Sequence, residues 1–263
     1  MKYGKEMDIS AFENFGIIAI LGFGLVGFVA GFVKGTTGFA MPMVMISGLA
    51  SVLSPELALA ALIMPTLVSN VWQSFRQGLV AALGSARKHI IFLMMLLPGI
   101  AVGAQFVRAL PPQLMFLVIG TLVTSFACIQ LLGWQPKLQN AGKRLASVGI
   151  GAFAGILGGL SGMWGPPTVM YLTTLETPKH EQMRVQGVVY GLGSVVLALA
   201  HVKSGVLVGD GLRLSIAMVP PALIGLWVGF MVLDRVDQQI FKRMTLCVLI
   251  VAGLNLIRRG VFG

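Results

Sequence analysis

The chain has 263 residues, of which 56% are hydrophobic and only 11% are charged, and its mean hydropathy is +0.89. A soluble domain of this length carries far more charge on its surface, so the composition excludes an ordinary globular fold. The formal net charge of +10 does not indicate a nucleic-acid-binding protein, because the lysines and arginines lie almost wholly between apolar runs, as in polytopic membrane proteins.

Long charge-free runs predict helices along the whole chain. A helix needs roughly 20 apolar residues to cross a membrane, and most of the runs approach or exceed this length. Charged residues precede the first run, which is therefore predicted to stay as a membrane span rather than to be a cleavable signal. The predicted helices lie near residues 15–33, 38–53, 56–75, 89–107 and 113–133 in the first half, and near 145–160, 162–175, 185–202, 213–231 and 239–257 in the second.

A pattern of glycine and proline occurs twice, with each copy inside an apolar stretch. The matching pairs, all 124 residues apart, are Gly27/Gly151, Gly31/Gly155, Gly35/Gly159, Gly38/Gly162 and Pro42/Pro166. A duplicated hydrophobic unit interrupted by glycine is typical of transporters built from two repeats. We therefore predict an all-α polytopic membrane protein with a first repeat over 1–136, a second over 145–263 and a linker over 137–144.

The number of membrane crossings, which the apolar runs put at about eight to ten, decides how the repeats are related. Eight crossings would give parallel repeats, and ten would invert one repeat against the other. The distribution of lysine and arginine does not choose between them. Residues 15–33 and 38–53 make about 28 Å and 24 Å of helix. Together they are too long for one crossing unless one of them is re-entrant, and this length favours the inverted arrangement.

The glycine clusters predict a break in one helix of each half. Compared with alanine, glycine costs a helix about 1 kcal/mol and proline about 3 kcal/mol. The first copy runs from Gly31 to Pro42 and the second from Gly155 to Pro167. An opened helix in lipid is tolerated only inside protein or beside a water-filled cavity. We therefore expect two helix starts, with Pro42 and Pro166 in their first turns, to point at a shared cavity and to form an anion site.

Several residues beside the breaks are candidates for binding the anion. Lys34 is the only full charge near either break, and a lysine inside a membrane segment is a functional hypothesis by default. The alternative is that Lys34 extends to the membrane interface from a segment end. Trp164 is expected to form a wall of the cavity, or otherwise to pack at an interface. The remaining candidates supply hydroxyl groups or backbone amides: Gly35, Thr36, Thr37, Gly38, Gly159, Ser161 and Gly162.

Two arginines are candidates for gate or vestibule charges. Arg184 lies one residue before a charge-free span, and Arg76 takes the similar place in the first half. A guanidinium binds an anion with a fork of donors, although either arginine could instead be a surface charge beside the membrane. The sequence contains no metal or cofactor motif, because His180-Glu181 lacks the second histidine of HExxH and no phosphate-binding loop occurs.

The paired motifs at 27–42 and 151–166 resemble those of the TauE/SafE family of sulfite exporters and toluene-sulfonate uptake permeases. The resemblance covers nearly the whole chain in length and in segment order. It implies a multi-pass permease of the bacterial inner membrane. The expected partners are the lipid bilayer and a small anion such as sulfite, a sulfonate or sulfoacetate, with no cofactor and no nucleic acid. A proton is the expected coupling ion, although no intramembrane carboxylate marks a proton path, so uniport or direct export stays open.

We therefore expect a secondary transporter for a small anion and not an enzyme. A passive anion channel would use the same groups and is the closest alternative. An integral-membrane enzyme would need a nucleophile–base or metal constellation within the membrane, and the sequence contains none. The sequence leaves open the exact substrate, the direction of transport and the coupling ion. It also leaves open the orientation of the termini and whether the protein forms a homo-oligomer.

Overall fold

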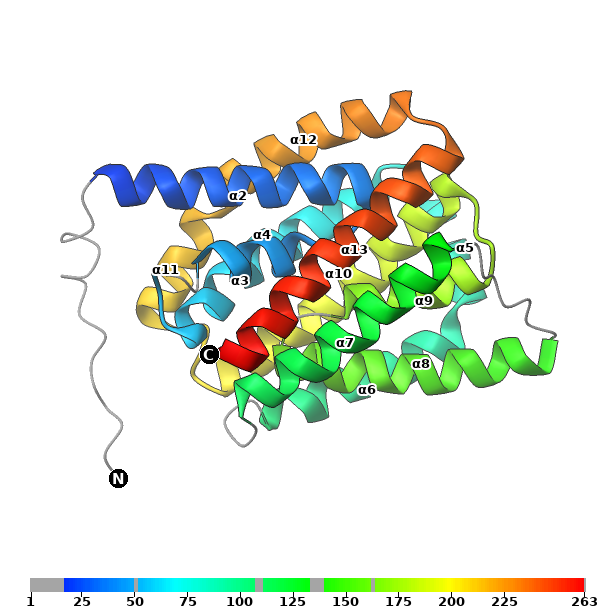
Figure 1. The fold of residues 1–263 in the computed structure, drawn as a ribbon, viewed down its shortest axis with the longest axis horizontal. Helices are drawn as coiled ribbons and strands as arrows, with labels where there is room; N and C mark the ends of the chain where they lie inside the picture. The colour runs from blue at the N-terminus through cyan, green and yellow to red at the C-terminus, as the bar shows by residue number, and fades with distance from the viewer. Residues whose placement is uncertain (1–16, 50–51, 107–110, 133–139, 162–163, 263) are drawn as a thin grey trace.

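A computed structural model describes residues 17–49, 52–106, 111–132, 140–161 and 164–262 of the protein (Figure 1). Every regular element within these ranges is an α-helix, which confirms the all-helical fold class. α8 begins at Asn140, within the stretch 137–144 predicted to link the repeats, and the division into two repeats stays a prediction. The helices are α2 (Ile17–Thr37), α3 (Met41–Leu49), α4 (Pro55–Phe75), α5 (Leu79–Lys88), α6 (Ile90–Gln105), α7 (Pro112–Leu131), α8 (Asn140–Ser161), α9 (Gly165–Thr174), α10 (Lys179–Lys203), α11 (Gly209–Ala217), α12 (Val219–Arg235) and α13 (Gln238–Phe262).

Within the described ranges, six helical segments are long and apolar enough to cross a membrane, which supports a multi-pass membrane protein. A seventh crossing results if α5 and α6, whose axes differ by 85°, together form one span. This number is below the eight to ten segments expected from the apolar runs, in part because α3 and α9 have only nine and ten residues. Helices of this length rise roughly 14–15 Å, which is about half of a bilayer's hydrocarbon core.

Two pairs of long helices are held together by glycines that let their backbones touch. α2 packs along α12, and α8 packs along α6. A Cβ atom at Gly31 would lie 1.9 Å from the carbonyl oxygen of Ala222, and a Cβ atom at Gly225 would lie 1.9 Å from that of Phe28. Because lipid supplies little hydrophobic attraction between helices, this close approach of the backbones provides much of the packing energy.

The helices α4 and α10 pack against each other in the interior and run antiparallel. Gln77, just after α4, donates to the carbonyl oxygen of His180 at the start of α10 (2.8 Å). Earlier in α4, Asn70 donates to Ser194, which lies later in α10 (3.4 Å). The short helices flank this pair, with α3 against α2 and α4, and α9 against α8 and α10. α7 and α13 lie side by side across the face that is in front in Figure 1.

The packing partners are exchanged between the two halves. The offset of 124 residues relates α2 to α8 and α6 to α12, so the pair α2–α12 corresponds to the pair α8–α6. The same offset relates α4 to α10 and α7 to α13, and the members of each of these pairs pack on each other. α2 and α8 run in opposite directions (Figure 1). Repeats related by a two-fold axis in the membrane plane would exchange partners and run in opposite directions in this way, and the inverted duplication itself stays a prediction from the sequence.

Candidate functional site

The first break lies directly after α2. This helix continues through Gly35 and ends at Thr37, and α3 begins at Met41. The break is therefore later than predicted, because the helix stays intact where its glycines pack against α12. Gly38 and Ala40, between the two helices, have positive φ angles of 85° and 68°. Such left-handed backbone is easy for glycine but strained for alanine, so the surrounding contacts must maintain the break.

The second break separates α8 from α9. α8 ends at Ser161, and α9 begins at Gly165 after Trp164 in the N-cap position. Pro166 lies in the first turn of α9, in agreement with the prediction. Gly162 and the side chain of Ser161 lie outside the described part of the chain, so the roles expected for these two residues stay predictions.

The two helix starts differ in the backbone donors that they offer. The first amides of a helix have no partner within the helix. In α3 only Pro42 lacks an N–H group, so Met41 and Met43 retain theirs. In α9 residues 166–167 are both proline, which leaves the N–H of Gly165. The start of α3 is therefore the better donor to an anion.

One pocket receives residues from both breaks. Its walls combine aromatic and apolar side chains with a few polar groups, a combination typical of small-molecule sites. The end of α2, the first break and the start of α3 supply five lining residues. The second break and the start of α9 supply two, and the interior helices α4 and α10 supply three. These residues are Lys34, Phe39, Ala40, Pro42, Met43, Thr66, Asn70, Trp164, Gly165 and Tyr190.

Lys34 is the only charged side chain in the described lining of this pocket, and it is only 1% exposed. Its Nζ donates a hydrogen bond to Oδ1 of Asn70 and lies 5.7 Å from the ring centroid of Tyr190. No described carboxylate forms an ion pair with it. The side chain does not extend to the membrane interface, because both its burial and its partners hold it inside. A buried amine without a counter-ion is expensive unless an anion joins it.

The second copy of the motif has no lysine at the position that matches Lys34, and the smaller residue there leaves room for the ring of Trp164 in the pocket. Gly158 takes the place that Lys34 has in the first copy. A Cβ atom at Gly158 would lie 2.7 Å from the indole of Trp164, so the glycine makes room for this ring. The indole also meets Tyr190 edge to face, with 6.5 Å between the ring centroids, and Tyr190 donates to the carbonyl oxygen of Gly165 (3.1 Å). The first half of the chain therefore contributes a cation to the pocket, and the second half contributes an aromatic wall.

Two polar residues of the pocket were not among the residues selected from the sequence. Asn70 accepts from Lys34 and donates to the carbonyl oxygen of Tyr190 (3.0 Å). The buried hydroxyl of Thr66 has no hydrogen-bond partner within the described residues. The sequence does contain a pattern that could have identified these two residues. Thr66 and Asn70 lie four residues apart on one face of a predicted apolar helix. Asn70 also corresponds to Ser194 at the repeat offset of 124 residues.

The hydroxyl groups of Thr36 and Thr37 are already bonded to their own helix. Thr36 donates to the carbonyl oxygen of Val33 (2.9 Å), and Thr37 donates to the same oxygen (2.7 Å). Neither threonine lines the pocket. Hydroxyls that bond back to a preceding turn of helix are not free to orient a ligand. The structure therefore does not support the binding role expected for these two residues.

The glycines Gly35 and Gly159 serve helix packing. A Cβ atom at Gly35 would lie 2.4 Å from the carbonyl oxygen of Leu226 in α12. A Cβ atom at Gly159 would lie 2.2 Å from that of Ile100 in α6. Both glycines lie within continuous helix, so their amides do not face the pocket as expected from the sequence. Gly38 is different, because it lies in the break and its N–H donates to the carbonyl oxygen of Lys34 (2.6 Å).

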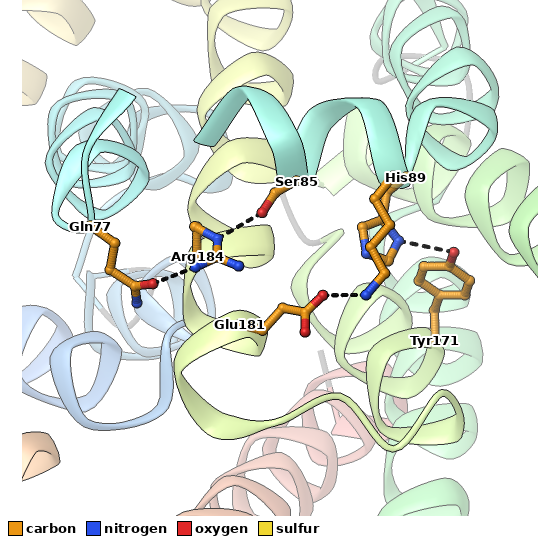
Figure 2. A network of polar contacts seen from close by, with 7 residues as sticks. Gln77, Ser85, His89, Tyr171, Glu181 and Arg184 are labelled. Carbon is orange, nitrogen blue, oxygen red and sulfur yellow. Dashed lines mark hydrogen bonds and ion pairs between the residues drawn. The ribbon is translucent and has the colours of Figure 1, made fainter. Parts of the chain in front are cut away.

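The arginines Arg76 and Arg184 lie beyond the pocket, near one end of the central pair of helices. Arg76 pairs with Asp234 (2.6 Å) and lies over the ring of Phe230. Arg184 donates to Ser85 (2.8 Å) and to Gln77 (2.7 Å), as Figure 2 shows. Neither arginine is among the described lining residues, so neither contacts an anion bound in the pocket.

Polar contacts tie α5, α9 and α10 together at this end (Figure 2). Lys88 pairs with Glu181, which links the end of α5 to the start of α10. His89, at the bend between α5 and α6, contacts the hydroxyl of Tyr171 in α9 (3.1 Å). Side-chain contacts therefore join three helices at the end of the molecule that carries both candidate gate arginines.

The comparisons with known proteins give one match. A family model described as "Sulfite exporter TauE/SafE" matches residues 23–256. No curated protein and no solved structure matches the chain. Within the described residues, no group of three or more histidine, cysteine, aspartate or glutamate side chains is placed to hold a metal ion.

Proposed function

The chain belongs to the sulfite exporter TauE/SafE family, a family of membrane transporters, and we propose that it is a secondary transporter for a small anion. The anion would bind in the pocket between the two breaks and would be a sulfur-containing or organic anion such as sulfite, a sulfonate or sulfoacetate. One observation carries this proposal. Lys34, a buried cation without a described carboxylate partner, lines a pocket to which both breaks contribute.

The proposed site holds the anion by one charge and by backbone donors. Lys34 supplies the charge, and its bond to Asn70 fixes where the ammonium lies. The amides of Met41 and Met43 at the start of α3 supply donors, and the helix dipole adds partial positive charge at the same point. Trp164 and Tyr190 form an apolar side of the pocket, suited to the carbon part of an organic anion.

The exchange of packing partners supports transport by alternating access. Inverted repeats present the same set of contacts to the two sides of a membrane, so small movements of one repeat against the other can open the site to either side. In this conformation the contacts in Figure 2, together with the pair Arg76–Asp234, join the helices at the end that carries Arg76 and Arg184. The proposed movement breaks some of these contacts while the pocket retains Lys34.

The basic end of the helix bundle indicates an orientation. α4, α5 and α12 finish at this end, and α10 begins there, as the bonds Arg76–Asp234 and Lys88–Glu181 require. Cytoplasmic ends of membrane proteins carry an excess of lysine and arginine. We therefore place this end toward the cytoplasm of a bacterial inner membrane. Its described basic residues include Arg76, Arg87, Lys88, Lys179, Arg184 and Arg235.

We also propose that transport is coupled to protons, but among the described residues no buried carboxylate is available to bind the proton. None of the described aspartate or glutamate side chains is buried. Proton relays in transporters are commonly built from buried carboxylates or histidines. If protons drive the transport, an imposed pH gradient will accelerate uptake into vesicles at constant membrane potential.

Counterflow in proteoliposomes tests the proposed function. Vesicles loaded with unlabelled sulfite or sulfonate should take up labelled anion transiently and with saturation, because a carrier exchanges the two through one site. A passive channel would instead give single-channel currents and no counterflow, and that result would contradict the proposal. Protein-free vesicles provide the baseline.

Valine substitutions at Thr36 and Thr37 are expected to leave the rate of anion uptake within about twofold of wild type. The two hydroxyls bond to the carbonyl oxygen of Val33 rather than facing the pocket, so their loss removes contacts within one helix only. Initial rates in proteoliposomes check this expectation. A loss of more than tenfold in a variant that unfolds at the wild-type temperature would place the hydroxyls at the substrate.

A further inference from the structure

Two glutamine side chains next to the first break are buried with unused hydrogen-bonding capacity. Gln186 in α10 is fully buried, and neither its Nε2 nor its Oε1 has a partner within the described residues. Gln73 in α4 donates to the carbonyl oxygens of Gly38 (3.1 Å) and Met183 (2.9 Å), but its Oε1 also has no partner. Polar atoms left unpaired inside a protein are costly, so a ligand or water that satisfies them is expected.

The two amides both lie beside Gly38. Gln73 bonds the carbonyl oxygen of Gly38, and a Cβ atom on Gly38 would lie 1.8 Å from Oε1 of Gln186. A side chain at this position would therefore displace the amide of Gln186. The positive φ of Gly38 favours glycine here.

Two helices, α4 and α10, give similar separations between these amides and the Lys34 pocket, at a rise of about 1.5 Å per residue. Gln73 lies about 4.5 Å beyond Asn70 along α4, and Gln186 lies about 6 Å from Tyr190 along α10. The amide pair is thus about one helical turn from the Lys34–Asn70 contact, toward the end that carries Arg184.

The unpaired atoms of the two glutamines determine which chemical group can bind to them. The acceptors are Oε1 of Gln73 and Oε1 of Gln186, and the donor is Nε2 of Gln186. A bare oxyanion only accepts hydrogen bonds, so it would leave both acceptors unpaired. A hydroxyl group both donates and accepts, so it can satisfy an amide oxygen and the amide nitrogen together. An ammonium group could donate but not accept, and the charges on either side, Lys34 and Arg184, are both positive.

We propose that Gln73 and Gln186 bind a hydroxyl group carried by the transported anion, about one helical turn from the anionic group held at Lys34. This inference rests on the proposed anion transport and specifies the class of substrate. The spacing suits a hydroxyl separated from the charged group by two carbon atoms. The substrate is therefore a small hydroxyalkyl anion rather than an unsubstituted one.

A matched pair of ligands tests the proposal on the purified full-length chain. 2-Hydroxyethanesulfonate and ethanesulfonate differ only in the hydroxyl group. Isothermal titration should find the hydroxylated ligand at least about tenfold tighter on the wild-type protein, because its absence leaves buried polar groups unpaired. Gln186→Leu should reduce this ratio to about one by weakening the hydroxylated ligand alone. Gln105→Leu, the same change at an exposed glutamine of α6, should keep the wild-type ratio.

The outcomes separate this inference from the function on which it rests. Equal affinity of the wild-type protein for both ligands, or an unchanged ratio in Gln186→Leu, would overturn the hydroxyl site and leave anion binding intact. If sulfite binds but neither sulfonate does, the hydroxyl site is likewise overturned and anion binding stays intact. If no anion binds the wild-type protein, the proposed function and the hydroxyl site both fail.

Discussion

Replacing Lys34 by methionine is expected to weaken binding of the anion by roughly 10- to 150-fold, the factor that corresponds to losing one charge-assisted hydrogen bond. Lys34 is the only charge in the described lining of the pocket, and no described residue can take over its role. Methionine keeps the length and the apolar stem of lysine, so the packing of α2 is largely retained. Titration of sulfite or a sulfonate into the purified variant measures the effect, and initial uptake rates at low anion concentration should fall in parallel.

A control separates loss of charge from loss of fold. Lys203→Met makes the same change at an exposed lysine at the end of α10, and it should bind and transport like the wild-type protein. The thermal unfolding temperature of Lys34→Met should lie at or above that of the wild type, because the substitution removes an uncompensated buried charge. Wild-type affinity in Lys34→Met would remove this lysine from the site.

Replacing Gly31 by alanine is expected to destabilise the protein by about 2–3 kcal/mol, as overpacking of a close contact does. The added Cβ atom would lie 1.9 Å from the carbonyl oxygen of Ala222, and backbone atoms cannot move aside as a flexible side chain can. α2 and α12 would have to separate. Thermal unfolding of the purified protein in detergent measures the effect.

Gly24→Ala is the matched control on the same helix. No atom lies within 4 Å of a Cβ built on Gly24, and alanine favours a helix more than glycine does. This variant should unfold at the wild-type temperature or slightly above it. If Gly31→Ala and Gly24→Ala unfold at the same temperature, the close contact of α2 with α12 is not present in the protein.

Much of the architecture could be predicted from the sequence, because hydropathy and glycine spacing are local signals. The apolar runs predict the long helices, and the clusters ending at Pro42 and Pro166 indicate where each broken helix resumes. The exact start of the first break could not be predicted. Glycine has a low helix propensity, so the sequence predicts that the helix ends near these residues. Gly31 and Gly35 instead lie where α2 touches α12, and this packing stabilises the helix.

The site could be predicted only in part, because its remaining contacts join distant parts of the chain. Lys34 and Trp164 adjoin the breaks, and the structure places both in the pocket. The partner of Lys34, Asn70, is 36 residues away, and Asn70 bonds a carbonyl oxygen 120 residues further along, at Tyr190. No local pattern indicates such pairings. Arg76 was a candidate gate or vestibule charge because of its position at a helix end, and its pairing with Asp234, 158 residues away, could not be predicted.

The central claim is that residues of both breaks share one pocket that an anion can occupy. Protection of introduced cysteines tests it most directly, with Ala40→Cys and Gly165→Cys made separately in a chain whose Cys128 and Cys247 are replaced by serine. A small thiol reagent should label both new cysteines, and sulfite or a sulfonate should slow both reactions with the same half-maximal concentration. The additional change Lys34→Met should abolish both protections. Protection of only one position, or of neither, would contradict a shared anion pocket.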